Sequence, residues 1–263
     1  MLAYPLIIAV TIAVSALTFF SGFGLGTLLL PCFLLFFPAD VAVAATAVVH
    51  LANNLFKGVL IGHKADYGVV IRFALPAAFM AILGALALEG LSRLPVLATY
   101  ELAHHSFFVT PIKLAVAVLM AFFSLMELHP RLTSLAFSPR LVPLGGALSG
   151  FFGGLTGHQG ALRSAFLIRL GLEKEAYIAT GVLSAVIIDV VRLTVYGVTF
   201  FSKDVHLLWA GGQAGFIAAG IAAALVGALL GNRFLRKVTL DAIQKLVGGL
   251  LLLYSLLLGS GLI

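Results

Sequence analysis

Polar side chains recur at helical spacing along an apolar stretch in the first half of the chain. The stripe consists of Thr46, His50, Asn53, Asn54 and Lys57. At about 100° per residue, these positions lie within roughly a 100° arc of one helix face. A Lys at the centre of a membrane helix costs about 3 kcal/mol to insert, so the stripe is expected to face other helices. There its donors could bind an anion, although Lys57 could instead extend its ammonium group to the membrane surface.

A carboxylate and a guanidinium lie one helical turn apart in the second half. Asp189 and Arg192 can pair in mid-span, which would neutralise most of the cost of burying either charge. Two interpretations stay open: the pair is a structural lock, or Arg192 binds an anion while Asp189 orients it or exchanges a proton. We favour the binding role. Further candidates for substrate binding, on another face of the same helix, are Thr180 and Ser184.

Clustered glycines interrupt an apolar segment in each half, at 21–27 and again at 149–160. Glycine permits tight backbone turns, and the half-helix after each break presents free N–H groups and a positive dipole end to an anion. His158 is also a candidate for proton coupling, because histidine changes charge near neutral pH. The alternatives are a hydrogen-bonded structural role for His158 and a surface charge just inside the hairpin for Arg163. The candidate binding residues at the two breaks are Gly24, Gly26, Thr27, Gly157, His158, Gln159 and Arg163.

The two halves repeat one order of features: a broken segment, then a helix with an Ala-Thr pair and polar residues, then two further apolar stretches. Later landmarks also recur, because Gly84-Ala85-Leu86 matches Gly227-Ala228-Leu229. Glycine-interrupted segments at corresponding places in two halves point to the binding site of a secondary transporter. We therefore expect one transmembrane domain over 1–263, with a first repeat at 1–128, a cytoplasmic linker at 129–140 and a second repeat at 141–263.

The composition excludes an ordinary soluble domain. The chain is 62% hydrophobic and only 10% charged, with a mean hydropathy of +1.16, whereas soluble domains are about 25% charged. We assign the net charge of +6 to membrane topology rather than to nucleic-acid binding, because no basic run is interleaved with aromatic residues. The apolar runs predict six full spans, at 41–61, 69–90, 112–128, 176–199, 207–230 and 242–262, and two broken segments at 6–37 and 141–170.

Basic loops set the expected orientation. The positive-inside rule places the loops around His63-Lys64, 131–140 and 233–237 in the cytoplasm. The spans then alternate correctly only if each broken segment is a re-entrant hairpin that enters and leaves by one face. The fold class is therefore an all-α polytopic membrane protein of two inverted pseudo-repeats, each a glycine-broken hairpin plus three transmembrane helices, with both termini outside. Irregular backbone at membrane depth must be surrounded by protein or water, so the two breaks are expected to meet near the midplane.

Several classes of chemistry lack their sequence signatures. The single cysteine, Cys32, excludes an intramolecular disulfide and a multi-cysteine metal site. The chain contains no zinc-protease motif, no P-loop and no nucleophile elbow. We therefore expect no enzyme activity, no cofactor, no metal site and no ATP-driven transport by this chain alone.

The chain resembles the TauE/SafE family of sulfite-exporter-like membrane proteins. The matching residues are 21–31, Ala45-Thr46 with Asn53-Asn54 and Lys57, the second break followed by Ala179-Thr180-Gly181, and 245–249. The resemblance covers essentially the whole chain. It implies export of small anions such as sulfite, sulfoacetate and other organosulfur compounds without ATP. The chain departs from the family pattern at 158–163, where His-Gln-Gly-Ala-Leu-Arg replaces a run of glycines, so we expect a subgroup with its own substrate.

Residues and resemblance together predict a secondary transporter, specifically an exporter, of a small anion such as sulfite or sulfoacetate. The anion would bind between the two broken hairpins, and its transport is expected to be coupled to protons or to the membrane potential. The expected setting is the lipid bilayer of the bacterial inner membrane. A passive anion channel and an uptake permease for a small carboxylate or sulfur compound are the alternatives. A homodimer stays an open alternative for the assembly.

Overall fold

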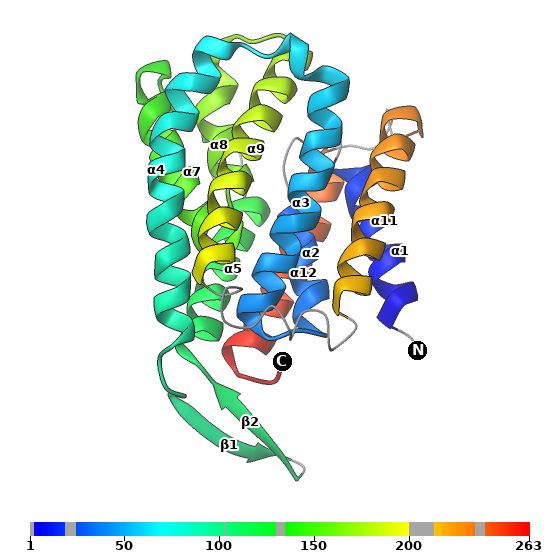
Figure 1. The fold of residues 1–263 in the computed structure, drawn as a ribbon, viewed down its shortest axis with the longest axis vertical. Helices are drawn as coiled ribbons and strands as arrows, with labels where there is room; N and C mark the ends of the chain where they lie inside the picture. The colour runs from blue at the N-terminus through cyan, green and yellow to red at the C-terminus, as the bar shows by residue number, and fades with distance from the viewer. Residues whose placement is uncertain (1–2, 19–24, 103, 130–134, 200–212, 235–239) are drawn as a thin grey trace.

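The structure is a computed structural model that describes residues 3–18, 25–102, 104–129, 135–199, 213–234 and 240–263. Helices dominate it (Figure 1). The α-helices are α1 (Ala3–Leu17), α2 (Leu25–Leu34), α3 (Ala39–Ile61), α4 (Tyr67–Ser92), α5 (Pro111–Leu128), α7 (Val142–Thr156), α8 (Gly160–Leu167), α9 (Lys174–Thr199), α11 (Gln213–Phe234) and α12 (Leu240–Gly259). Short 3₁₀ turns cover η1 (Gly62–Lys64), η2 (Pro139–Leu141) and η3 (Ile168–Leu170).

Four of the described helices are long and apolar enough to cross a membrane: Ala39–Lys64, Tyr67–Ser92, Lys174–Thr199 and Ala214–Gly231. Shorter apolar helices cover Tyr4–Leu17, Leu25–Leu34, Pro111–Met126 and Gly248–Gly259. The prediction of an all-α polytopic membrane protein is confirmed. The predicted spans correspond to α3, α4, α5, α9, α11 and α12, although 207–212 lie outside the described residues.

Local sequence explains where several helices begin and end. The Asp66 side chain accepts a hydrogen bond from the backbone N–H of Val69 (3.0 Å), which caps α4. Thr110 caps α5 in the same way, with Pro111 at the first helical position. Gly157 ends α7 in the left-handed conformation (φ +86°), which glycine adopts without strain.

A β-hairpin, absent from the sequence-based expectations, joins α4 to α5. Strand β1 (Ala98–Leu102) pairs antiparallel with β2 (His105–Val109). The Tyr100 ring stacks on Phe107, with centroids 5.5 Å apart. The Tyr100 hydroxyl donates to the carbonyl of Ser260 (2.7 Å), which attaches the hairpin to the end of the chain.

The connections lie at two opposite ends of the molecule. Figure 1 shows the C-terminus, the start of α1 and the β-hairpin at one end, which we call the hairpin end. The α3–α4 turn and the α8–α9 connection lie at the other, which we call the turn end. Lys64 forms an ion pair with Glu175 there, and Arg72 donates to the carbonyl of Pro139 (3.4 Å).

Both broken segments form helical hairpins. In Figure 1, α1 and α2 open toward the hairpin end, whereas α7 and α8 open toward the turn end. Helix α1 packs against α11, and α7 packs against α4, so each hairpin lies on a long helix from the other half. Helices α3 and α9 pack on each other, as do α5 and α12.

Glycines allow the backbones of α4 and α7 to touch. Added Cβ atoms at Gly146, Gly150 and Gly154 would lie 2.1–2.2 Å from carbonyl oxygens of α4. These glycines recur every four residues, so they form one stripe along α7. Such small-residue stripes let membrane helices approach closely.

Candidate functional site

A buried ion pair occupies the interface of α3, α8 and α9. Asp189 and Arg192 of α9 are both fully buried (0% exposed). The Arg192 guanidinium donates from Nε (3.0 Å) and Nη2 (2.8 Å) to one carboxylate oxygen, Oδ1 of Asp189. Its Nη1 donates to the carbonyl of Gly153 (3.1 Å), near the end of α7. The arginine therefore links its own helix to the second hairpin.

The same carboxylate binds groups from the first half and from the second break. His50 of α3 lies with Nδ1 2.6 Å from Asp189 Oδ2, and it must donate there because a carboxylate only accepts. The Gln159 side-chain amide donates to Oδ1 (3.0 Å). The Asn54 amide lies 3.1 Å from His50 Nδ1 and 3.5 Å from Oδ2. Asp189 thus joins both halves of the chain.

Buried positive charge exceeds buried negative charge. Lys57, Arg163 and Arg192 are 4%, 3% and 0% exposed. Asp189 is the one buried carboxylate among the side chains that the structure describes, which leaves an excess of two positive charges with histidines neutral. Arg163 donates to the Gln159 side-chain oxygen (3.3 Å), and the charges of Lys57 and Arg163 are close enough to repel each other.

The two glycine breaks approach each other beside this ion pair. A Cβ atom added to Gly26 of α2 would lie 3.4 Å from the His50 ring and 3.7 Å from the Gly157 carbonyl oxygen. One added to Gly157 would lie 2.8 Å from Arg192 Nη1. Thr27, the next residue in α2, is partly buried. Gly24, also a predicted site residue, lies outside the described residues.

His158 has different partners from those of Asp189. Its Nδ1 lies 2.9 Å from the Thr156 hydroxyl, and its ring stacks on Phe123 with centroids 5.2 Å apart and an 8° angle. Its Nε2 is buried and has no hydrogen-bond partner within the described ranges. Of the two histidines in the predicted site, the structure joins His50, not His158, to Asp189.

The remaining predicted residues fall into two groups. Thr46 and Asn53 lie on the stripe of α3, and both carry a buried polar atom without a described partner, Oγ1 and Nδ2 respectively. Thr180 lies farther away, where its hydroxyl accepts from the backbone N–H of Asp66 (2.9 Å). Ser184 donates to the carbonyl of Thr180 (2.8 Å). The structure thus uses this second pair for local hydrogen bonds near the turn end.

Three hydroxyl groups around the site were not predicted. Tyr196 donates to the carbonyl of Gly154, and Ser149 donates to the carbonyl of Gln159 (2.7 Å), which supports the second break. The Ser15 hydroxyl of α1 donates to the carbonyl of Ala224 (2.6 Å) and lies 3.1 Å from the Asn53 side-chain oxygen. Tyr196 follows Arg192 by four residues, so helical periodicity already puts it on the face of Asp189 and Arg192, although no binding role was predicted for it. The two serines carry no such signal.

A polytopic helical membrane protein with buried charged side chains beside two broken hairpins has the architecture of a membrane transporter. The chain belongs to the sulfite exporter TauE/SafE family, whose model matches residues 7–258. The resemblance inferred from the sequence is thereby confirmed, and the protein is a multi-pass membrane transporter. No curated protein and no solved structure matches the chain.

Proposed function

We propose that this protein is a secondary transporter that exports a small anion across the bacterial inner membrane. The substrate is a sulfur-containing oxyanion or organosulfonate, such as sulfite or sulfoacetate. The family supports the class of substrate. The anion binds between the two broken hairpins, near Gly26, Gly157 and Arg192.

The excess of buried positive charge carries this proposal. Three cations and one carboxylate lie in a region that apolar helices surround. Charged side chains inside a membrane are costly, and they mark sites that act on ions. A small anion is attracted to a region with more buried cations than carboxylates, and guanidinium groups bind oxyanions through paired N–H donors.

Unpaired polar atoms on the site residues support the same location. Thr46, Asn53 and His158 each carry one buried atom without a partner in the described part of the chain. Buried polar groups are normally hydrogen-bonded, so such atoms call for an explanation. Polar side chains that bind a substrate during only part of a cycle provide one.

We assign the coupling of the anion to a proton to the Asp189 carboxylate. It occupies two N–H donors of Arg192 that an oxyanion would also use. A proton on the carboxylate, delivered through His50, removes its charge and frees the guanidinium. Anion and proton binding then favour each other. A dianion that moves with one proton keeps one negative charge, so an inside-negative membrane potential drives it outward.

Inverted repeats would explain the exchanged packing of the hairpins. Helix α7 lies on α4, and α1 lies on α11. Gly84 of α4 and Gly227 of α11 occupy matching sequence landmarks. An added Cβ on Gly84 would lie 2.1 Å from a carbonyl oxygen of α7, and one on Gly227 would lie 2.5 Å from one of α1. We propose the repeats at 1–128 and 141–263 on this basis, with the linker in the cytoplasm.

Flux measurements test the proposed activity. Purified protein in proteoliposomes is expected to move sulfite or sulfoacetate faster than sulfate, with substrate-dependent proton movement in the same direction. Asp189→Asn is expected to remove the dependence on a pH gradient, because the carboxylate that takes the proton is gone. Currents without proton movement would instead establish a channel, and no flux of any of these anions would overturn the proposal.

Labelling of introduced cysteines tests the orientation. Cysteines at His104 and Leu262, both at the hairpin end, are expected to react from outside with an impermeant thiol reagent. A cysteine at His63, at the turn end, is expected to react only after the membrane is opened. Cys32 is buried and gives the background. The opposite pattern would contradict the proposed orientation.

A further inference from the structure

A small pocket lies between α8 and α9, on the side of the ion pair that faces the turn end. It encloses about 200 Å³ of empty space, including the part open to solvent. Most of that space is open to solvent, and the enclosed part has room for only about one water molecule, so a small anion would occupy the open mouth of the pocket. Its lining residues are Arg163, Ser164, Leu167, Tyr177, Ile178 and Gly181.

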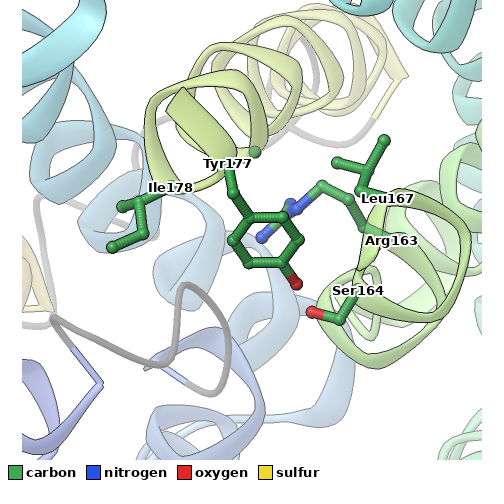
Figure 2. Close-up of a pocket in the computed structure, with 6 residues that line it drawn as sticks. Arg163, Ser164, Leu167, Tyr177 and Ile178 are labelled. Atoms are coloured by element: carbon green, nitrogen blue, oxygen red, sulfur yellow. The ribbon is translucent and has the colours of Figure 1, made fainter. Parts of the chain in front are cut away.

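The polar groups of the pocket are all hydrogen-bond donors suited to an anion. Figure 2 shows the Ser164 and Tyr177 hydroxyl groups pointing toward one another, with the Arg163 guanidinium behind the Tyr177 ring. Arg163 is only 3% exposed, whereas Ser164 and Tyr177 are partly exposed. No carboxylate lines the pocket. A guanidinium with two hydroxyl groups can bind an oxyanion through three donors.

Gly181 leaves the space that the guanidinium of Arg163 occupies. A Cβ atom at this position would lie 3.3 Å from Arg163 Nε, which is tight for a charged and hydrogen-bonding group. Gly181 and Arg163 come from different helices, α9 and α8. The pocket is therefore built by the pairing of these helices rather than by one of them.

One side chain connects the pocket to the central ion pair. Arg163 donates to the Gln159 side-chain oxygen (3.3 Å), and the Gln159 amide donates to Asp189 (3.0 Å). Along α9, Gly181 precedes Asp189 by eight residues, or about 12 Å at 1.5 Å per residue. An anion on Arg163 would therefore lie about two turns of α9 away from the pair of Asp189 and Arg192.

The position of the pocket indicates the side from which it fills. Tyr177 follows Glu175 in the first turns of α9, and Glu175 is paired with Lys64 at the turn end. Basic residues at this end include Lys64, Arg72, Arg140 and Arg169. The positive-inside rule places such an end in the cytoplasm.

We infer that this pocket is a cytoplasmic entry site, where an incoming oxyanion binds Arg163, Ser164 and Tyr177 before it reaches Arg192. This inference rests on the proposed function. The shared chemistry is that of a sulfite, a sulfonate or the phosphate of a lipid headgroup. We assign the pocket to the free anion. Arg163 is connected through Gln159 to Asp189, and a transported anion would use this connection whereas a lipid headgroup would not.

The double variant Ser164→Ala, Tyr177→Phe tests the inference, since it removes two donors and keeps the shape of both side chains. Sulfite uptake is measured in inside-out and in right-side-out vesicles. The half-saturating sulfite concentration at the cytoplasmic face is expected to rise about tenfold, as for the loss of two hydrogen bonds. The half-saturating concentration at the outer face and the maximal rate of outward transport are expected to stay unchanged. The maximal rate of inward transport is expected to fall in proportion, because the transport equilibrium fixes the ratio of maximal rate to half-saturating concentration between the two faces. Tyr67→Phe, also at the turn end but outside the pocket, is the matched control and is expected to behave as the unmodified protein.

The outcomes separate the two proposals. If the unmodified protein moves no sulfite from either face, the proposed function fails. If it moves sulfite but the double variant has the same half-saturating concentration at the cytoplasmic face, the entry site fails and the function stands. The measurement is repeated in proteoliposomes of neutral lipid alone. An effect of the double variant that appears only with anionic lipid would assign the pocket to a headgroup and overturn the inference.

Discussion

Helix α7 uses glycine for two different purposes on two of its faces. Toward α4, the stripe of Gly146, Gly150 and Gly154 brings two backbones into contact. Toward α9, Gly153 and Gly157 expose their backbone to Arg192: the Gly153 carbonyl accepts from it, and Gly157 leaves room for it. The first face has no space for any side chain, whereas the second keeps space for a charged group. Glycine richness alone therefore does not identify a binding site.

Substitution on the packing face is expected to have the largest effect. In Gly150→Val, the new Cβ would lie 2.1 Å from the carbonyl oxygen of Ala77. The two helices would have to separate along their length and lose their shared packing, which costs more than the roughly 1–3 kcal/mol of ordinary overpacking. We expect little folded protein by size-exclusion chromatography after detergent extraction. Gly249→Ala, whose Cβ meets no atom within 4 Å, is the control and is expected to extract normally. Recovery of folded Gly150→Val would refute the close contact.

Changes to the ion pair are expected to rank next. Removal of one partner of a buried pair costs about 3–5 kcal/mol. Asp189→Asn is expected to lower thermal stability more than Arg192→Gln, because it leaves three buried cations, whereas Arg192→Gln leaves a carboxylate still bound to His50. The double variant should recover most of the stability yet transport nothing, because a neutral amide does not replace a guanidinium. Thermal unfolding in detergent and flux are the two readouts. A stable and fully active double variant would disprove a binding role.

A substitution on the open face is expected to affect stability least and activity strongly. Gly157→Val places a branched side chain at φ +86° and a Cβ 2.8 Å from Arg192 Nη1. The backbone strain costs roughly 1–3 kcal/mol, so the protein should still insert and extract with a lower melting temperature. Transport should be abolished, since the guanidinium is displaced. Normal flux would mean that this glycine only ends the helix.

The sequence predicted the helices well and their contacts poorly. Apolar run length and charged punctuation determine where a chain can span a bilayer, and the bounds of α3, α4 and α9 follow from them. The β-hairpin was missed because Ala98–Leu102 is mostly exposed and shows no alternation of burial. Which histidine binds Asp189 depends on how α3 packs against α9. No spacing within either helix reports that packing, so only the structure could distinguish His50 from His158.

The charged residues of the candidate site were predicted from the sequence, whereas several of its hydroxyl groups were not. Charges inside apolar spans stand out, so Lys57, Asp189 and Arg192 were singled out from their type alone, and the structure buries all three. Ser164 and Tyr177 were not, because hydroxyl groups are common in helices and these two come together only across the α8–α9 interface. Thr180 was named because its Ala-Thr pair matches that of Thr46. Its hydroxyl, however, accepts a hydrogen bond from the backbone N–H of Asp66, just before α4.

The exchanged packing of the two hairpins has a consequence for biogenesis. Helix α1 ends at Leu17, but its main partner α11 begins at Gln213, almost two hundred residues later in synthesis. At roughly 5–20 residues per second, α1 waits about 10–40 s in or at the membrane before that partner leaves the ribosome. Throughout that interval the Ser15 hydroxyl lacks its carbonyl acceptor, which belongs to Ala224 of α11. The first hairpin is therefore expected to rely on lipid or on insertion factors until α11 is synthesised.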